Sequence, residues 1–256
     1  MDTLQHKQYK ILLIGDSCTD VYVLGNCLRL SPEAPVPVFT KESKDRRLGM
    51  SSNVYSNIKS ISKNIVTHVT NDESRIKKIR FIDSKSKHQI MRYDIEKEIS
   101  SISAADLPSG NFDAILISDY DKGLIDKSLP PAIRKKYSCP IFVDTKKQDL
   151  SIYDGCVIKV NESEFDSAIN TEGLELIVTL GPSGAKMGDV VYPTDKVDVH
   201  DVCGAGDVFL AGLVVRWLET NDMPSAIKTA NRCAAHSVTK PGTYSLSRQE
   251  YEDLRV

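Results

Sequence analysis

Asp201-Val-Cys-Gly-Ala-Gly-Asp207 is a glycine-rich turn that leads directly into the segment Val208–Glu219. Apolar residues recur in that segment at helical spacing: Phe209, Leu210, Leu213, Val214, Trp217 and Leu218. A turn of small residues at the start of a helix leaves backbone N–H groups free to bind an anion, and the helix dipole adds partial positive charge. The stretch therefore predicts an anion hole, formed by Gly204, Ala205 and Gly206, at the head of a helix.

Asp207 lies in the first turn of this predicted helix, where its carboxylate could accept the proton of an attacking hydroxyl group. The neighbouring anion hole would stabilise charge that develops on a phosphoryl group during transfer. A tight helix start with a capping aspartate explains the same residues about equally well. The turn alone therefore does not establish catalysis.

Short apolar runs alternate with helix-compatible segments over the rest of the chain. Lys10–Asp16 ends in Gly-Asp, and similar runs occupy 114–118, 141–144, 157–160 and 176–180. Such runs suit strands that are buried on both faces of a parallel sheet. Segments that suit helices lie at 51–61, 124–136, 162–169 and from about 222 to 242. The alternation predicts an α/β fold whose mainly parallel sheet binds ligands at the carboxyl ends of its strands.

Two segments interrupt this alternation, at 21–41 and 76–94. The first contains Ser31-Pro-Glu-Ala-Pro-Val-Pro-Val38, whose prolines exclude a helix and favour an extended edge strand. The second contains two strand-like runs around a polar turn at 83–87, which is the pattern of a β-hairpin. Together they predict a small β-flap, or lid, over the mouth of the sheet in a single domain that spans 1–256.

A second glycine turn, Thr179-Leu-Gly-Pro-Ser-Gly-Ala185, follows the last apolar run. It could carry nucleotide phosphates, and a plain β-turn before a strand at Met187–Tyr192 is an equal alternative. Asn161-Glu-Ser-Glu164 stands where the 157–160 strand ends. Its carboxylates could hold Mg2+ through water. An asparagine N-cap followed by acidic residues explains this pattern as well.

Composition excludes several classes of partner. The formal net charge of −2 argues against a nucleic-acid-binding surface. The six cysteines are scattered without the spacing of a zinc site, and no secretory signal is evident, so we expect reduced thiols in a cytoplasmic protein. The longest apolar stretches, such as Val208–Val215, are too short to span a membrane.

The Asp201–Asp207 segment with its helix resembles the signature of the PfkB, or ribokinase-like, sugar kinases. Upstream stretches are similar to the kinase half of the ADP-heptose synthesis enzymes, which phosphorylates heptose 7-phosphate at the anomeric oxygen: Gly15-Asp16 with Asp20, Arg29–Val38 and Gly49–Asn53. Further matches follow in the expected order at 118–123, 143–146, 161–165 and 240–243. The resemblance implies a three-layer ribokinase-like fold and transfer of the γ-phosphate of ATP to a sugar hydroxyl.

The resemblance also implies roles for single residues. Asp207 would be the catalytic base beside the anion hole. The sugar would contact Asp16, Asp20, Gly49 and Asn53. The nucleotide would be bordered by Thr179, Gly181, Gly184 and Asn231.

Two carboxylates and two basic side chains complete the implied site. Glu164 would organise Mg2+, and Asp201 would belong to a loop for a monovalent cation such as K+. Arg92 and Lys122 are candidates for binding the phosphate of the substrate itself, and an ordinary surface role is an equal alternative for both.

The sequence also departs from the family. Met50 follows Gly49 where paired glycines are usual, so a thioether would stand next to the sugar. The chain is shorter than usual after 66–69 and between 164 and 176, and we see no nucleotidyltransferase half. A kinase for another sugar or nucleoside, and a catalytically silent member that binds sugar or a partner protein, remain alternatives.

The predicted lid also bears on assembly. Its exposed edges and apolar positions, such as Val36, Val38 and Phe81, predict a homodimer joined through the lids.

Overall fold

The computed structural model describes residues 7–256. Its main body is an eight-stranded sheet in the order β12-β11-β10-β9-β8-β7-β1-β4. The strands are β1 (Lys10–Gly15), β4 (Ile65–Thr70), β7 (Ala114–Asp119), β8 (Ile141–Thr145), β9 (Val157–Asn161), β10 (Glu175–Thr179), β11 (Ala185–Met187) and β12 (Val190–Tyr192). The six strands from β4 to β10 run parallel, and β11 and β12 are antiparallel. The prediction of a mainly parallel sheet is confirmed.

Helices cover both faces of this sheet and create two hydrophobic cores. In β1, Ile11 and Leu13 belong to the core on one face, whereas Leu12 and Ile14 belong to the core on the other. This alternation explains why the run is apolar throughout. The first core is closed by α1 (Ser51–Ile61), α4 (Ala205–Thr220), α5 (Met223–Ser237) and α6 (Arg248–Leu254), and the second by α2 (Leu129–Lys136).

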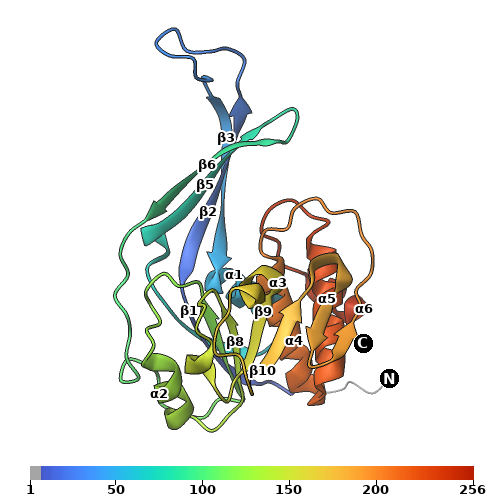
Figure 1. Ribbon diagram of the computed structural model, residues 1–256. Coiled ribbons are helices and arrows are strands. Elements are labelled where there is room, and N and C mark those ends of the chain that lie inside the picture. The colour runs from blue at the N-terminus through green and yellow to red at the C-terminus, as the bar shows by residue number, and fades with distance from the viewer. Residues whose placement is uncertain (1–6) are drawn as a thin grey trace.

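The lid is a separate four-stranded sheet in the order β3-β2-β5-β6. It consists of β2 (Ser17–Asn26), β3 (Thr40–Met50), β5 (Ile76–Asp83) and β6 (Gln89–Glu96). Figure 1 shows it as a long arm that rises from the body of the molecule. The β5–β6 hairpin confirms the hairpin predicted for 76–94.

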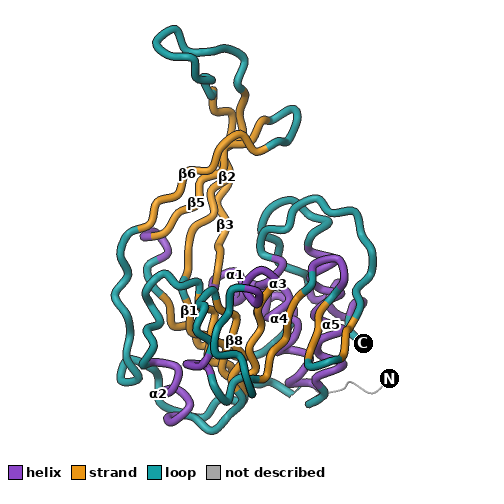
Figure 2. Tube along the Cα trace, viewed as in Figure 1, coloured by secondary structure: helices purple, strands orange, loops and turns teal. Residues whose placement is uncertain are grey.

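The predicted edge strand at Ser31–Val38 is wrong. This segment belongs to the loop at the far end of the arm, where only an isolated bridge joins Leu30 to Pro37 (Figure 2). Its prolines remove backbone donors, and the chain folds back on itself through a bond from Ser31 N–H to the Val36 carbonyl. The edge strand is β3 instead, whose run of charged residues hid it from a search for apolar patterns.

Three other boundaries differ from the predictions. α2 begins at Leu129 rather than at 124, because Asp126 accepts hydrogen bonds from the backbone of Ser128 and Leu129 in a turn just before it. α3 (Glu162–Asp166) is shorter than predicted. The strand predicted for Met187–Tyr192 is a tight hairpin of β11 and β12 around Gly188, which has a φ of 56°.

The lid is also bonded to the C-terminal part of the body. The Arg47 guanidinium on β3 donates to the carbonyl groups of Pro241 and Thr243, at 2.6 and 3.0 Å. No helix in residues 7–256 is long and apolar enough to cross a membrane.

Candidate active site

The predicted anion hole lies at the head of α4. Gly204 precedes the helix with a φ of 78°, in the left-handed region that glycine adopts without strain. A Cβ atom there would come within 2.6 Å of the Asn53 side-chain amide nitrogen. The positive φ and the lack of space for a Cβ atom both require a glycine at this position. Because Gly204 approaches Asn53 so closely, the start of α4 lies against α1.

Asp207 follows in the first turn of α4 and is only 2% exposed. Its carboxylate accepts two hydrogen bonds, one from Asn53 Nδ2 at 2.9 Å and one from the Tyr120 hydroxyl at 2.8 Å. Burial raises the pKa of Asp207 to about 6, although both hydrogen bonds lower it. Asp207 is therefore mostly ionised at neutral pH and can accept a proton.

Two lysines that the sequence did not single out stand at the same edge of the sheet. Lys159 on β9 forms a buried ion pair with Asp144 on β8 at 2.9 Å. A Cβ atom at Gly206 would lie 2.9 Å from Lys159 Nζ, so this ammonium group touches the anion hole. Lys146, just after β8, pairs with Glu164. The site thus contains two ammonium groups, each paired with a carboxylate, near the turn that precedes α4.

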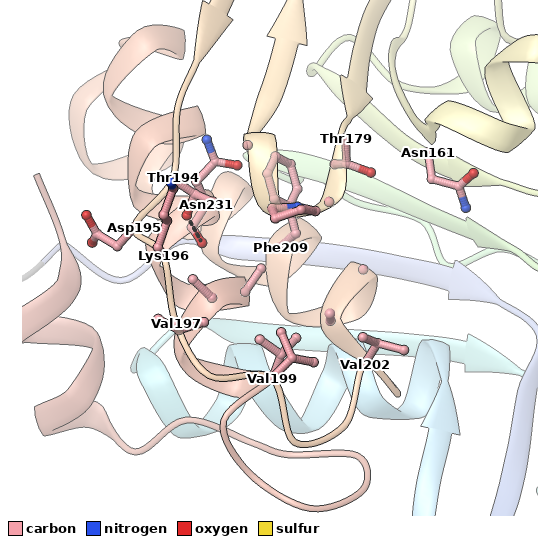
Figure 3. A pocket seen from close by; sticks show the side chains of 18 residues that line it. Asn161, Thr179, Thr194, Asp195, Lys196, Val197, Val199, Val202, Phe209 and Asn231 are labelled. Atoms are coloured by element: carbon pink, nitrogen blue, oxygen red, sulfur yellow. Dashed lines mark hydrogen bonds between the residues drawn. The ribbon is translucent and has the colours of Figure 1, made fainter.

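A cavity of about 530 Å³ opens beside this turn (Figure 3). Its lining includes all four predicted nucleotide residues and also Ala205 and Gly206 of the anion hole: Thr179, Gly181, Gly184 and Asn231. Apolar side chains form much of the rest: Val197, Val199, Val202, Phe209 and Val238. Apolar walls that lead to the predicted anion hole suit a purine nucleotide.

Three of the predicted sugar contacts lie on α1 and on the lid strands β2 and β3. Asn53 bonds to Asp207 directly, as described above. Asp20 on β2 is buried and forms an ion pair at 2.5 Å with Arg80 from β5 of the lid. Gly49 lies against the Asp20 carboxylate, and a side chain at 49 would collide with it.

The sequence of this chain is similar to those of known proteins. The pfkB family carbohydrate kinase model matches residues 133–250. The bifunctional protein HldE of Campylobacter jejuni (strain RM1221) is 30% identical over 100% of this chain and 66% of its own length. HldE of Helicobacter pylori (strain J99) is 31% identical over 94% of this chain and 65% of its own length.

The chain belongs to the PfkB family of carbohydrate kinases. It covers 66% of the length of the C. jejuni relative, and it aligns with the kinase half of that protein. Two solved structures show the same fold. Phosphofructokinase-2 from Escherichia coli in complex with potassium has a TM-score of 0.76 at 14% identity, over 96% of this chain and 98% of that one. Ribokinase from Thermotoga maritima has a TM-score of 0.71 at 16% identity, over 96% of this chain and 99% of that one.

Within this PfkB site, Asp16 has a different environment from the one we expected. Its carboxylate is fully buried and accepts hydrogen bonds from the backbone N–H groups of Tyr120, Lys122 and Leu124, at 2.9, 3.2 and 3.2 Å. These bonds hold the loop after β7. A contact between Asp16 and the sugar stays a prediction.

Met50 also differs from the expectation. It is 3% exposed and belongs to the core on the α2 side of the sheet, although a thioether beside the sugar was predicted. Its φ of 58° lies in the region that the family's usual glycine would adopt without strain.

The two cations predicted for the substrate phosphate do not reach Asp207. Arg92 is half-exposed on β6 and pairs with Asp94 at 2.9 Å. Lys122 pairs with Glu96 at 2.6 Å. Their role in binding the acceptor remains a prediction.

The two carboxylates predicted for cations are both engaged by the protein. Glu164 accepts from the backbone of Asn161 in a capping box, besides its ion pair with Lys146. Asp201 accepts from the backbone of Cys203 and of Gly242, at 2.9 Å each. Residues 7–256 contain no group of three or more His, Cys, Asp or Glu side chains that could hold a metal alone. A metal ion here would need ligands from the nucleotide or from water.

Proposed function

We propose that this chain transfers the γ-phosphate of ATP to the anomeric hydroxyl of D-glycero-D-manno-heptose 7-phosphate. The observation that carries the proposal is the buried Asp207 carboxylate, which accepts a hydrogen bond from the predicted sugar contact Asn53. Gly206, the residue before Asp207, lines the nucleotide-sized cavity. The acceptor follows from the resemblance of 15–53 to the ADP-heptose synthesis enzymes, together with 30% identity to HldE over the full chain.

The residues present support a direct in-line transfer. Ionised Asp207 removes the proton from the acceptor hydroxyl, and the resulting oxygen attacks the γ-phosphorus. The bond between that phosphorus and the bridging oxygen breaks, and ADP leaves. The backbone N–H groups of Gly204 and Gly206 and the Lys159 ammonium would bind the negative charge on the transferring group. The Ala205 N–H donates to the Val202 carbonyl at 3.3 Å and would join them only if that bond opens. The proton on Asp207 then passes to solvent.

Mg2+ fits the site as an ion that arrives with the nucleotide. Glu164 is the nearest predicted partner, and its carboxylate would meet the ion through water, because Mg2+ keeps several of its own waters. When bound, the ion would neutralise charge on the phosphates. Asp201 would border a K+ loop, since each of its oxygens accepts one backbone hydrogen bond and keeps a further lone pair.

The exposed apolar side chains of the lid bear on assembly. On the lid face away from Arg80, Met91 and Tyr93 are 52% and 54% exposed, and Val36 at the tip is 52% exposed. Phe81 lies on this face too, packed edge-on against Phe39. We propose that two chains pair through these apolar surfaces.

ATP consumption against a panel of acceptors tests the proposed acceptor. We expect kcat/KM for heptose 7-phosphate to exceed by far the values for ribose, fructose and adenosine. A nucleoside as the best acceptor would refute the heptose proposal and leave the kinase assignment in place.

A further inference from the structure

We infer that Tyr120 is a positioning residue, which holds the Asp207 carboxylate in the orientation that accepts the proton of the sugar hydroxyl. The inference rests on the proposed role of Asp207 as the base. Sequence comparison gave Tyr120 no role, although it lies in the stretch 118–123 that matches the family. The geometry around its hydroxyl group carries the argument.

The two oxygens of Asp207 each receive one donor. Asn53 binds Oδ2 and the Tyr120 hydroxyl binds Oδ1, at 2.9 and 2.8 Å. Two donors from different elements fix both the position and the rotation of the carboxylate plane. Each oxygen keeps a second lone pair, so the group can still accept a proton from the substrate.

The loop that carries Tyr120 is held by several independent contacts. The buried Asp16 carboxylate accepts three backbone N–H bonds from it, including that of Tyr120 itself. Asp121 has a φ of 55°, a strained value for a residue with a side chain. Gly123 has a φ of 112°, and a Cβ atom there would lie 2.9 Å from the Ile99 carbonyl oxygen. These contacts hold the backbone from which the Tyr120 side chain extends.

The ring of Tyr120 also connects the lid to the site. Lys78 Nζ on β5 lies 5.7 Å from the ring centroid, and Lys146 Nζ lies 5.4 Å from it. Cations over an aromatic face are attracted to it and would restrain the ring. The phenol is therefore placed by the body of the molecule and by the lid together.

Besides the hydrogen bond from Tyr120, several titratable groups affect the charge of Asp207. Asp144 on β8 raises its pKa, and Lys159 on β9 lowers it. Lys146 and Cys18 also interact with the Asp207 charge, from the end of β8 and from β2. Tyr120→Phe leaves all of these groups in the protein. A shift in the pKa of Asp207 in that variant therefore reports on the hydrogen bond from the Tyr120 hydroxyl.

The test is a carboxyl 13C NMR titration of protein labelled at aspartate, in which loss of a resonance in D207N identifies Asp207. In Tyr120→Phe we expect the midpoint of Asp207 to move up by about one pH unit, because a donor to the ionised form is lost. Tyr153→Phe is the matched control, since Tyr153 donates to another buried carboxylate, Asp119. It should leave the Asp207 midpoint unchanged.

Kinetics supply the second readout. Tyr120→Phe should lower kcat about tenfold and leave the KM for ATP within about twofold, because a misplaced base affects the chemical step. A midpoint for Asp207 within about 0.2 unit of the wild-type value, or an equal rise in Tyr153→Phe, would overturn the inference. If the wild-type protein phosphorylates no acceptor, the proposed function fails, and the titration still decides whether Tyr120 controls Asp207.

Discussion

At the scale of single residues, Asp207 is the group on which the proposed chemistry depends. Asp207→Asn keeps the size of the side chain but removes the base, and it replaces one of the two oxygens that accept from Asn53 and Tyr120 with an NH2 group. We expect kcat to fall by roughly 10²–10⁴-fold, the usual contribution of a positioned base. Nucleotide binding, measured by calorimetry with MgADP, should be nearly unchanged.

A control separates this effect from a general loss of charge. Asp253→Asn changes an exposed aspartate on α6, far from the turn at 201–207 in sequence, and should keep full activity. Turnover of Asp207→Asn close to that of the wild-type protein would show that Asp207 is not the base.

Residues in the glycine turns were predictable from the sequence, and residues that meet them from other strands were not. Asp207 and Gly204 stand within one motif whose helix can be recognised locally. Lys159 and Tyr120 reach the site only because neighbouring parallel strands end at the same edge of the sheet. Polar residues at the ends of successive apolar runs were the available signal, and it was used for Asp16 and for Asn161–Glu164 but not for Tyr120 or Lys159.

At the scale of elements, the contact between α1 and α4 depends on Gly204. Gly204→Ala places a Cβ atom in a left-handed backbone and against the Asn53 amide that bonds to Asp207. We expect the free energy of unfolding to fall by about 1–3 kcal/mol and kcat to fall as Asn53 is displaced. Chemical denaturation and steady-state kinetics measure the two effects.

Gly173 offers a matched control for that substitution. It has a φ of 75°, close to that of Gly204, and a Cβ atom there would meet nothing within 4 Å. Gly173→Ala should therefore carry the backbone strain alone and keep its kcat. The account of the α1–α4 contact fails if both variants retain wild-type turnover.

The elements that the sequence predicted well are those with a periodic apolar pattern. α1 was predicted with its observed boundaries, and the five apolar runs differ from β1, β7, β8, β9 and β10 by at most one residue at each end. β3 was missed because the lid exposes it and its sequence is charged, so no apolar alternation marks it. The proline-rich loop was wrongly predicted as a strand. Prolines exclude a helix, but they do not make a segment pair with a neighbouring strand.

At the scale of the whole molecule, the lid predicts how chains assemble. We expect a dimer in sedimentation equilibrium. The double substitution of Met91→Glu and Tyr93→Glu should convert it to a monomer by placing charge on the exposed lid face. Val190→Glu on β12 is the control, because Val190 is 54% exposed but lies on the large sheet. A wild-type mass that stays monomeric at all concentrations would contradict the prediction.

Transfer to the anomeric oxygen of heptose 7-phosphate can be followed by 31P NMR of the reaction. With ATP, Mg2+ and heptose 7-phosphate, we expect one new phosphate ester at the anomeric carbon for each ADP formed, while the 7-phosphate signal remains. The Asp207→Asn variant should form almost none. ADP without a new ester, or no ADP above the level of that variant, would contradict the claim.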